Sequence, residues 1–434
     1  MKKIVLLVAI ATSIFVSSCN EEFIDPTRPS ESNVFSNKDG LIGVANGLQS
    51  KWSVGGQSPL YASIIATGCT TNELTFSAGA GNNNELALEA GGDNINNINS
   101  VVNNLWSQTL IVRAEAQKVI DNINVISVPV EKASILAHAS IFKAMSLGTL
   151  AQYFQEVPIV VQQNAPFSSR TVVLNEAINT LLATLPTINN ATGFAGLANS
   201  IKYKDTVYAL LARYYNMLGD NTNALIYANL VNLNTKSTYL YDAVIENPVF
   251  RAGFFQTPAV GSRPRNRNFG LFGNLTPNVV DGRISFHFTP AATPINYGNF
   301  FNAANKLIPV YLPGEIILIK AEVLARTSQL LPATTQLNLI LQKSVASDAF
   351  GIGANLPAYS GPNTQSDLLL EIYKNRCIEL HMTGLKFEDV KRFNRPLATF
   401  PILIGSNFEF NRNYFPYPQS ERFNNTNTPP DPTN

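Results

Sequence analysis

The sequence is poor in charged residues, and its two signs of charge are balanced. Its 434 residues include 31 lysines and arginines against 30 aspartates and glutamates, which leaves a net charge of +1. Nucleic-acid binding needs a basic surface that neutralises phosphates, and no cluster of basic residues stands out. Three arginines, at positions 263, 265 and 267, fall in a loop with proline and asparagine, and we interpret them as a solvated or ion-paired turn. The sequence therefore argues against a nucleic-acid partner.

Cysteine is also scarce, with three residues in the whole chain. So few cysteines exclude a disulfide framework of the kind that holds small secreted domains together. Cys69 and Cys377 are expected to be buried free thiols, although an oxidising compartment would allow them to pair. Cys19 has a different role, which its neighbours indicate.

The sequence offers little to build a catalytic or metal site. Its three histidines are far apart and are expected on helix surfaces or in loops: His138, His287 and His381. None stands in a metal-ligand spacing, so we expect no metal and no cofactor. Carboxylates such as Glu371 with Glu379, or Glu388 with Asp389, can be proposed as a glycosidase pair, but no sequence rule places them across a sugar. No catalytic residue is predicted, and the chain is expected not to be an enzyme.

The first residues carry an export signal. A basic start is followed by the apolar run Ile4–Val16, which is shorter than the roughly 20 residues that a membrane-spanning helix needs. Two serines precede Cys19, and Asn20-Glu21-Glu22 follows it. This pattern predicts a cleaved signal peptide at 1–18, a lipidated Cys19 and a tether at 19–35. An ordinary secretory signal with an incidental cysteine is the alternative. Later in the chain, the apolar stretch Leu307–Ala325 is broken by prolines and charges and is predicted to be a core helix.

With 45% hydrophobic residues, the chain can bury a large core, and its hydrophobic spacing predicts a mostly helical domain from 36 to 434. A capping box at Ser36–Asp39 is expected to start a helix that ends near Trp52. Further helices are predicted at Val101–Ile120, with Trp106 in the core, and at Glu131–Phe154 and Thr171–Leu185.

Two segments are typical of tetratricopeptide-like helix pairs. Tyr203–Val231 turns at Gly219-Asp220, and Ile316–Leu341 breaks at the sequence Leu330-Leu331-Pro332. Such pairs stack on one another, because each buries the apolar face that its neighbour exposes. We therefore predict a scaffold of stacked helix pairs.

Two segments lack this periodicity. Pro59–Gly92 is rich in glycine and polar residues and is predicted to be a long functional loop, and about 237–305 is predicted to be a loop-rich insertion dense in aromatic residues. Flat apolar rings beside amides and hydroxyls can bind a neutral polar ligand. Six rings in these segments are predicted to contact the ligand: Phe76, Phe254, Phe255, Phe272, Tyr297 and Phe300. The alternative is that each ring plugs its loop onto the scaffold.

Three stretches resemble the SusD/RagB family of outer-membrane nutrient-binding lipoproteins. Ala137–Val160 is similar to the family's long helix with an aromatic pair and a Val-Pro exit, Leu369–Arg392 to its charged C-terminal signature, and Phe415–Arg422 to its proline-containing tail. Six signature positions match: Arg376, Glu379, Leu380, Gly384, Asp389 and Arg392. Three depart from it: Asn375, Thr383 and Lys386.

The resemblance implies a SusD-like domain of tetratricopeptide-like pairs that captures a nutrient and delivers it to a SusC-like TonB-dependent transporter. It implies an oligosaccharide ligand, with peptides as the alternative, and a structural role for the charged signature. It also implies a lipid-anchored protein of the outer membrane, and the acidic residues after Cys19 are similar to a surface-export tag. A helical-repeat adaptor is a further alternative, which the aromatic loops and the lipid anchor disfavour.

Overall fold

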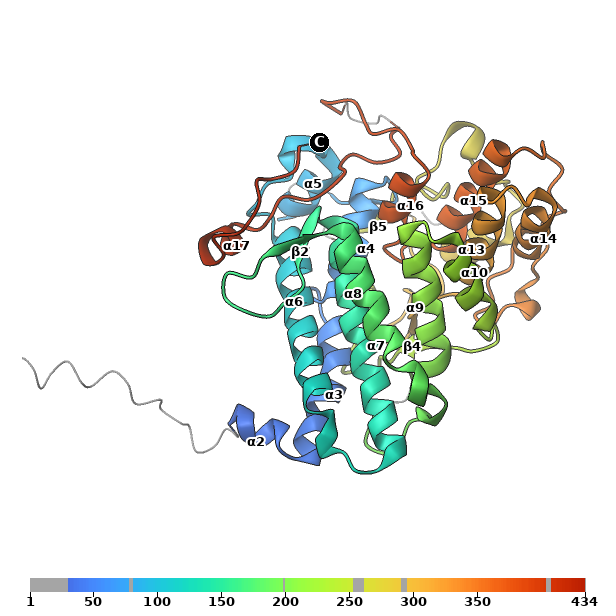
Figure 1. The fold of residues 1–434 in the computed structure, drawn as a ribbon. Coiled ribbons are helices and arrows are strands. Elements are labelled where there is room, and N and C mark those ends of the chain that lie inside the picture. The colour runs from blue at the N-terminus through green and yellow to red at the C-terminus, as the bar shows by residue number, and fades with distance from the viewer. Residues whose placement is uncertain are drawn as a thin grey trace, which may run out of the picture.

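The computed structural model describes residues 30–77, 81–197, 200–252, 261–289, 295–402 and 407–433. Cys19, Phe254 and Phe255 therefore lie outside the described residues. The described chain is mostly helical, as predicted, and its long helices stand side by side in Figure 1. The five longest on the N-terminal side are α3 (Lys38–Ser53), α6 (Ser100–Asp121), α7 (Pro129–Tyr153), α8 (Arg170–Leu182) and α9 (Tyr203–Leu218).

Helix α7 is the centre of the fold. It packs against α3, α6, α8 and α9, and most of its residues are buried on every side. Among the described residues, it is the helix long and apolar enough to cross a membrane, but 89% of its most apolar stretch is buried inside the protein. Its apolar surface is therefore explained by the core that surrounds it. Gly148 allows the closest approach, since a Cβ there would lie 2.3 Å from the ring of Tyr214 on α9.

Helix α3 begins differently from the prediction. Ser36 does not cap it, because a short helix α2 (Glu31–Phe35) precedes it and ends at Ser36. Asn37 is the N-cap, and its side chain accepts a hydrogen bond of 2.8 Å from the amide of Gly40. Asparagine is as favourable an N-cap residue as serine, so capping preference alone does not distinguish Asn37 from Ser36.

The prediction of a long loop over Pro59–Gly92 is wrong for most of this segment. It contains α4 (Pro59–Thr70), the strand β1 (Leu74–Thr75), α5 (Asn83–Ala90) and a 3₁₀ turn η1 (Gly92–Asn94). Ser58 caps α4, and Pro59 occupies its first position, where proline is favoured. Almost all of α4 is buried, so it has no polar face and lacks the amphipathic period that identifies a surface helix.

Both predicted helix pairs are present. Helices α9 and α10 (Asn221–Leu230) turn at Gly219, whose φ of +78° favours glycine. Helices α13 (Pro313–Arg326) and α14 (Leu330–Leu341) form the second pair, but Pro332 lies in the first turn of α14 and the break falls just before Leu330. The pairs stack through α10 and α13, and α15 (Gln365–Glu379) packs on α13 (Figure 1).

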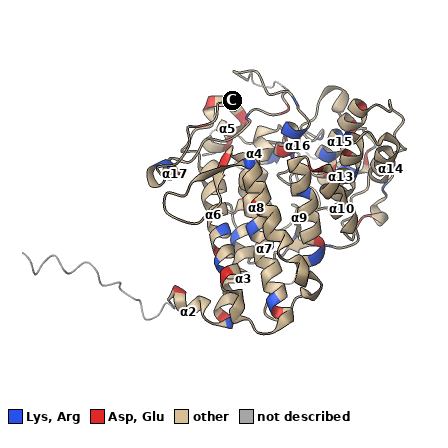
Figure 2. Cartoon of the chain, viewed as in Figure 1, with Lys and Arg blue, Asp and Glu red and all other residues tan. Residues whose placement is uncertain are grey.

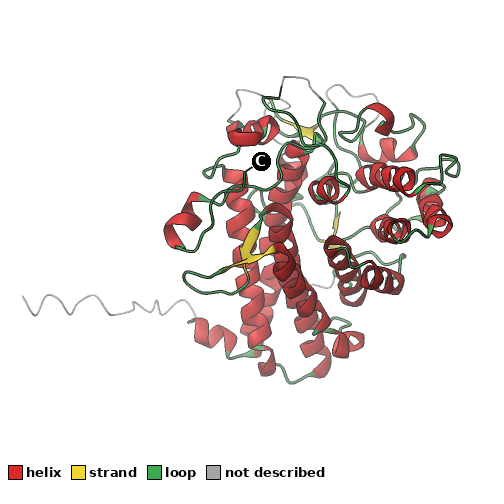
Figure 3. Cartoon of the chain, turned by 45° about the horizontal axis from the view of Figure 1, so that its top comes forward, coloured by secondary structure: helices red, strands yellow, loops and turns green. Residues whose placement is uncertain are grey.

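The strands are short and each pairs with one partner (Figure 3). β1 pairs with β5 (Arg263–Pro264), β2 (Glu156–Pro158) with β3 (Phe167–Ser169), and β4 (Thr238–Tyr239) with β6 (Ile308–Pro309), all antiparallel. The remaining elements are short: η2 (Ile123–Val125), η3 (Leu185–Asn190), α11 (Pro248–Phe250), η5 (Gly273–Leu275), α12 (Gly282–His287), η6 (Val345–Ser347), α16 (Lys386–Arg392) and α17 (Gln419–Asn424). Within the described part of 237–305, regular structure is limited to such short pieces.

Candidate functional site

The charged C-terminal signature is a buried ion-pair network. The guanidinium of Arg376 lies 2.9 Å from the carboxylate of Asp389, and that of Arg392 lies 2.5 Å from it. Asp389 is 2% exposed, so it cannot reach a ligand in solution. Figure 2 shows these charges gathered where α13, α15 and α16 meet. The network ties three helices together, which is the structural role expected for the signature.

A second buried network surrounds Arg283 on α12, which is fully buried. Its Nη2 lies 2.7 Å from Asp281 Oδ2 and 2.8 Å from Asn375 Oδ1, and its Nη1 lies 3.4 Å from Glu379 Oε2. Lys343 pairs with Glu379 and, at 2.8 Å, with Asp348. Glu379 therefore joins two cations in the core, where it is also unavailable for acid or base chemistry.

All three histidines are buried. His138 and His287 lie in helices but not on their surfaces, which corrects the expectation for them, whereas His381 fills the loop between α15 and α16. His287 and His381 meet with ring centroids 5.5 Å apart, and His381 Nδ1 lies 3.1 Å from the carboxylate of Glu73. Phe269 packs edge-on against both rings. Within the described residues no three His, Cys, Asp or Glu side chains are placed to hold a metal ion. The cysteines Cys69 and Cys377 are free and buried, as expected.

Burial of His138 predicts an acid-sensitive fold. Its Nε2 lies 2.9 Å from the carbonyl of Ala45, and burial lowers its pKa to about 4. The unfolded chain, with an ordinary histidine pKa near 6.5, binds protons first as the pH falls, so stability present above pH 6.5 is lost toward pH 4. His287 adds to this, since burial and then the positive charges near it hold its pKa well below the usual value.

We expect the protonation of His138 on unfolding to lower the free energy of unfolding by about 2 kcal/mol as the pH falls from 7 to 5. His138→Gln keeps an N–H donor for the Ala45 carbonyl but does not titrate, so its loss over this range should be smaller by about that amount. Urea unfolding of both proteins at the two pH values measures the difference. Equal pH dependence in both proteins would contradict the assignment.

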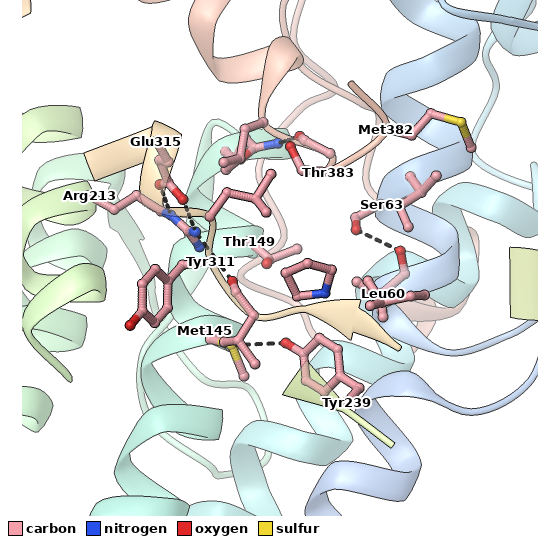
Figure 4. Close-up of a pocket in the computed structure, with 18 of the residues that line it drawn as sticks. Leu60, Ser63, Met145, Thr149, Arg213, Tyr239, Tyr311, Glu315, Met382 and Thr383 are labelled. Atoms are coloured by element: carbon pink, nitrogen blue, oxygen red, sulfur yellow. Dashed lines mark hydrogen bonds and ion pairs between the residues drawn. The ribbon is translucent and has the colours of Figure 1, made fainter. Parts of the chain in front are cut away.

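An enclosed cavity lies at the centre of the protein, between α4, α7, α9, β6 and the connection from α15 to α16 (Figure 4). On its wall, Arg213 and Glu315 form a two-bond ion pair of 2.6 and 2.7 Å. Tyr239 donates a hydrogen bond of 3.4 Å to Met145 Sδ, while the buried Tyr311 hydroxyl has no partner among the described residues. The cavity volume is about 70 Å³, enough for a few waters and far below that of a sugar. It is therefore too small to enclose a whole sugar ring.

The structure separates the aromatic residues that were predicted to bind a ligand. Phe76 is 9% exposed, and Tyr297 is 2% exposed with its hydroxyl 2.6 Å from Ser262 Oγ, so both rings are committed to the core. Phe300 is half-buried beside the central cavity, with its ring centroid 5.1 Å from that of Phe286. Phe272 is half-buried and lines an open hollow on the surface. Of the four described rings, Phe272 is thus placed best for contact with a ligand.

This surface hollow, which we call the Phe272 hollow, has a volume of about 540 Å³. Its walls combine aromatic and proline rings with an exposed amide: Phe272, Phe408, Pro396, Pro401 and Asn407. Glu409 also lines the hollow, and its Oε2 lies 2.7 Å from Arg395 Nε in an ion pair. The amide of Ala398 donates a bond of 2.8 Å to the carbonyl of Phe410, which closes the segment on itself.

Sequence reasoning missed the other half of this hollow. The segment from Pro396 to Glu409 follows the charged signature and has no helical period, and its prolines beside Phe408 and Asn407 were the available signal. Nothing in the sequence indicated that it would fold against Phe272, which lies more than a hundred positions earlier. Such a pairing depends on tertiary contacts between distant loops.

The comparisons bear on the fold. No known protein-family model and no curated protein matches the chain. Solved structures do match. A SusD-like carbohydrate binding protein from Bacteroides vulgatus has a TM-score of 0.70 and 16% sequence identity, and the match covers 90% of this chain and 97% of that one. A SusD superfamily protein from Bacteroides thetaiotaomicron has a TM-score of 0.68 and 15% identity, with 91% of this chain and 99% of that one covered, and NanU of B. fragilis has a TM-score of 0.66 and 13% identity, with 94% and 99% covered. The chain therefore has the SusD-like fold over nearly its whole described length.

Proposed function

We propose that this protein is a non-catalytic nutrient-binding lipoprotein that captures an oligosaccharide and delivers it to a SusC-like TonB-dependent transporter. The observation that carries the proposal is the shared fold, since structures with this fold include proteins named as carbohydrate or sugar binding. Cys19, outside the described residues, is the proposed lipid anchor in the outer membrane, with the domain facing the cell exterior.

The Phe272 hollow is the proposed capture site. Its volume of about 540 Å³ falls within the range of small-molecule sites, and it is open enough to hold one part of a longer chain. A sugar ring presents C–H faces that pack on aromatic rings and hydroxyls that bond to amides, and Phe272 and Asn407 offer both kinds of contact. The near-neutral charge of the protein suits a neutral ligand. Phe254, Phe255 and Phe300 remain proposed contacts, whereas Phe76 and Tyr297 are buried in the core.

Peptides are a second candidate ligand for the same role. Tryptophan is the most effective ring for stacking on sugars, and both tryptophans of this chain, Trp52 and Trp106, are buried at 4% and 1% exposure. Any stacking must then use phenylalanine or tyrosine, which bind apolar peptide side chains equally well. Peptides are therefore a ligand class to compare with oligosaccharides in a binding experiment.

A binding screen of oligosaccharides and peptides against the purified protein tests the proposal. We expect at least one oligosaccharide to bind, and we expect it to be recovered intact after prolonged incubation, because the signature carboxylates are paired and buried. Binding of peptides alone would select the second candidate. Hydrolysis that a single carboxylate substitution abolishes would overturn the non-catalytic role.

A further inference from the structure

A second open hollow, which we call the Arg326 hollow, lies where the first helix pair meets the C-terminal helices. Its volume is about 480 Å³, and it shares no lining residue with the Phe272 hollow. Its polar walls come from the end of α9 with the following turn, the end of α13, the first turn of α15 and the end of α16: Asn216, Gly219, Arg326, Gln365 and Arg392.

The charges behind this hollow do not balance. Burial by itself raises the pKa of Glu322, but Arg392, Arg376 and Arg326 together lower it to about 2. Asp389 is the other carboxylate in contact with these arginines, through Arg376 and Arg392. Three guanidiniums therefore share two carboxylates, and one positive charge is left over.

Neighbouring groups do not supply the missing negative charge. Glu388 is paired with Arg170 at 2.6 Å, so this pair is neutral as a unit. Lys391, on the same helix as Arg392, is a further cation, although burial lowers its pKa to about 7. Asp367, in the first turn of α15, bonds to its own cap residue Thr364 and is not among the ion-pair partners of the three arginines.

Arg326 is the arginine of this cluster with the most exposed side chain at the hollow. Arg392 also lines the hollow, but its side chain is 9% exposed and its unpartnered Nε is itself buried. Arg326 is 27% exposed; its Nε holds Glu322 at 2.8 Å and its Nη2 donates a bond of 3.0 Å to the carbonyl of Arg392, so the exposed edge of its guanidinium is the part that can reach the hollow. A guanidinium matches the planar oxygens of an oxyanion.

We propose that the Arg326 hollow binds an anionic group: a carboxylate on a sugar, or a free oxyanion. The first turn of α15, which begins at Gln365, lies on the same wall. The anion completes the charge of the arginine cluster and reaches it through Arg326. This site is separate from the Phe272 hollow and does not depend on what binds there.

Calorimetric titration of the purified protein with three probes at constant ionic strength tests the proposal. The probes are D-glucuronate, D-glucose as its uncharged counterpart, and inorganic sulfate. We expect glucuronate to bind and glucose not to bind at this site. Sulfate binding as tight as that of glucuronate would assign the site to oxyanions in general, and preference for glucuronate would assign it to acidic sugars; both support the proposal.

Arg326→Gln should weaken the binding of glucuronate about tenfold or more, because it removes the open half of the charged fork. Arg422→Gln is the matched control, since Arg422 is 28% exposed and paired with Asp431 but lies on α17 away from the hollow. Gln365→Ala tests the same wall without disturbing the ion pairs of Glu322, should Arg326→Gln fail to fold. The proposal is overturned if neither anion binds the wild-type protein, or if Arg326→Gln or Gln365→Ala binds glucuronate as tightly as Arg422→Gln does.

Discussion

Replacing Arg283 by methionine is expected to lower the free energy of unfolding by about 3 to 5 kcal/mol. Arg283 is fully buried and holds Asp281 with two bonds, of 3.0 Å from Nε and 2.7 Å from Nη2. Methionine fills a similar volume, but it leaves Asp281 in the core without its guanidinium and Glu379 with Lys343 as its remaining cation. Buried charges that lose a partner keep their full desolvation cost.

Two comparisons separate this effect from a loss of packing. Adding Glu379→Gln to Arg283→Met removes one of the carboxylates that lost a cation and should restore about 1 to 2 kcal/mol. Arg422→Gln, which breaks a partly exposed pair with Asp431, should change stability by less than about 1 kcal/mol. Chemical denaturation of the four proteins provides the values. A loss below about 1 kcal/mol in Arg283→Met would show that the buried network does not hold these helices together.

Replacement of Cys19 by alanine, behind an ordinary cleavable secretory signal, should release nearly all of the protein from the membrane fraction. The physical reason is that two acyl chains on a terminal cysteine supply stable attachment, whereas the long apolar helix α7 is already enclosed in the core. Cell fractionation followed by detection of the protein measures the distribution.

The matched control keeps residues 1–19 unchanged and should stay in the membrane fraction. The experiment is best done in cells that lack the proposed transporter, because binding to it would also hold the protein at the membrane. If the alanine protein remains there without the transporter, then Cys19 is not the anchor.

Helices with one polar face were predicted well. α6 and α9 were located to within a residue or two, because their buried positions recur every three or four residues. α4, which has 12 residues, was missed because burial on nearly all sides leaves no polar face to mark the period, whereas the similarly buried α7 was recognised over its 25 residues. The burial of His138 and His287 was not predicted, because an imidazole packed among aromatic rings has no sequence signature.

The candidate site was predicted less well than the fold. Absence from a helical pattern does not make a ring free to bind, because Phe76 and Tyr297 are both buried. Phe272 lies in an open hollow because a distant segment around Phe408 completes its walls. The Arg326 hollow was not predicted, since Arg392 belongs to a signature whose match implied only a structural role, and Arg326 lies on another helix far from it in the sequence.

The central claim, that an oligosaccharide is captured in the Phe272 hollow, is tested most directly by measuring the affinity of Phe272→Ala for an oligosaccharide that binds the wild-type protein. We expect a loss of about 1 to 3 kcal/mol of binding free energy with little change in melting temperature, because a half-buried ring at a surface site contributes more to binding than to the core. Phe423→Ala, which removes a ring that is 77% exposed on α17, should leave the affinity unchanged. The same affinity in Phe272→Ala and Phe423→Ala, or no oligosaccharide bound by the wild-type protein, would contradict the account.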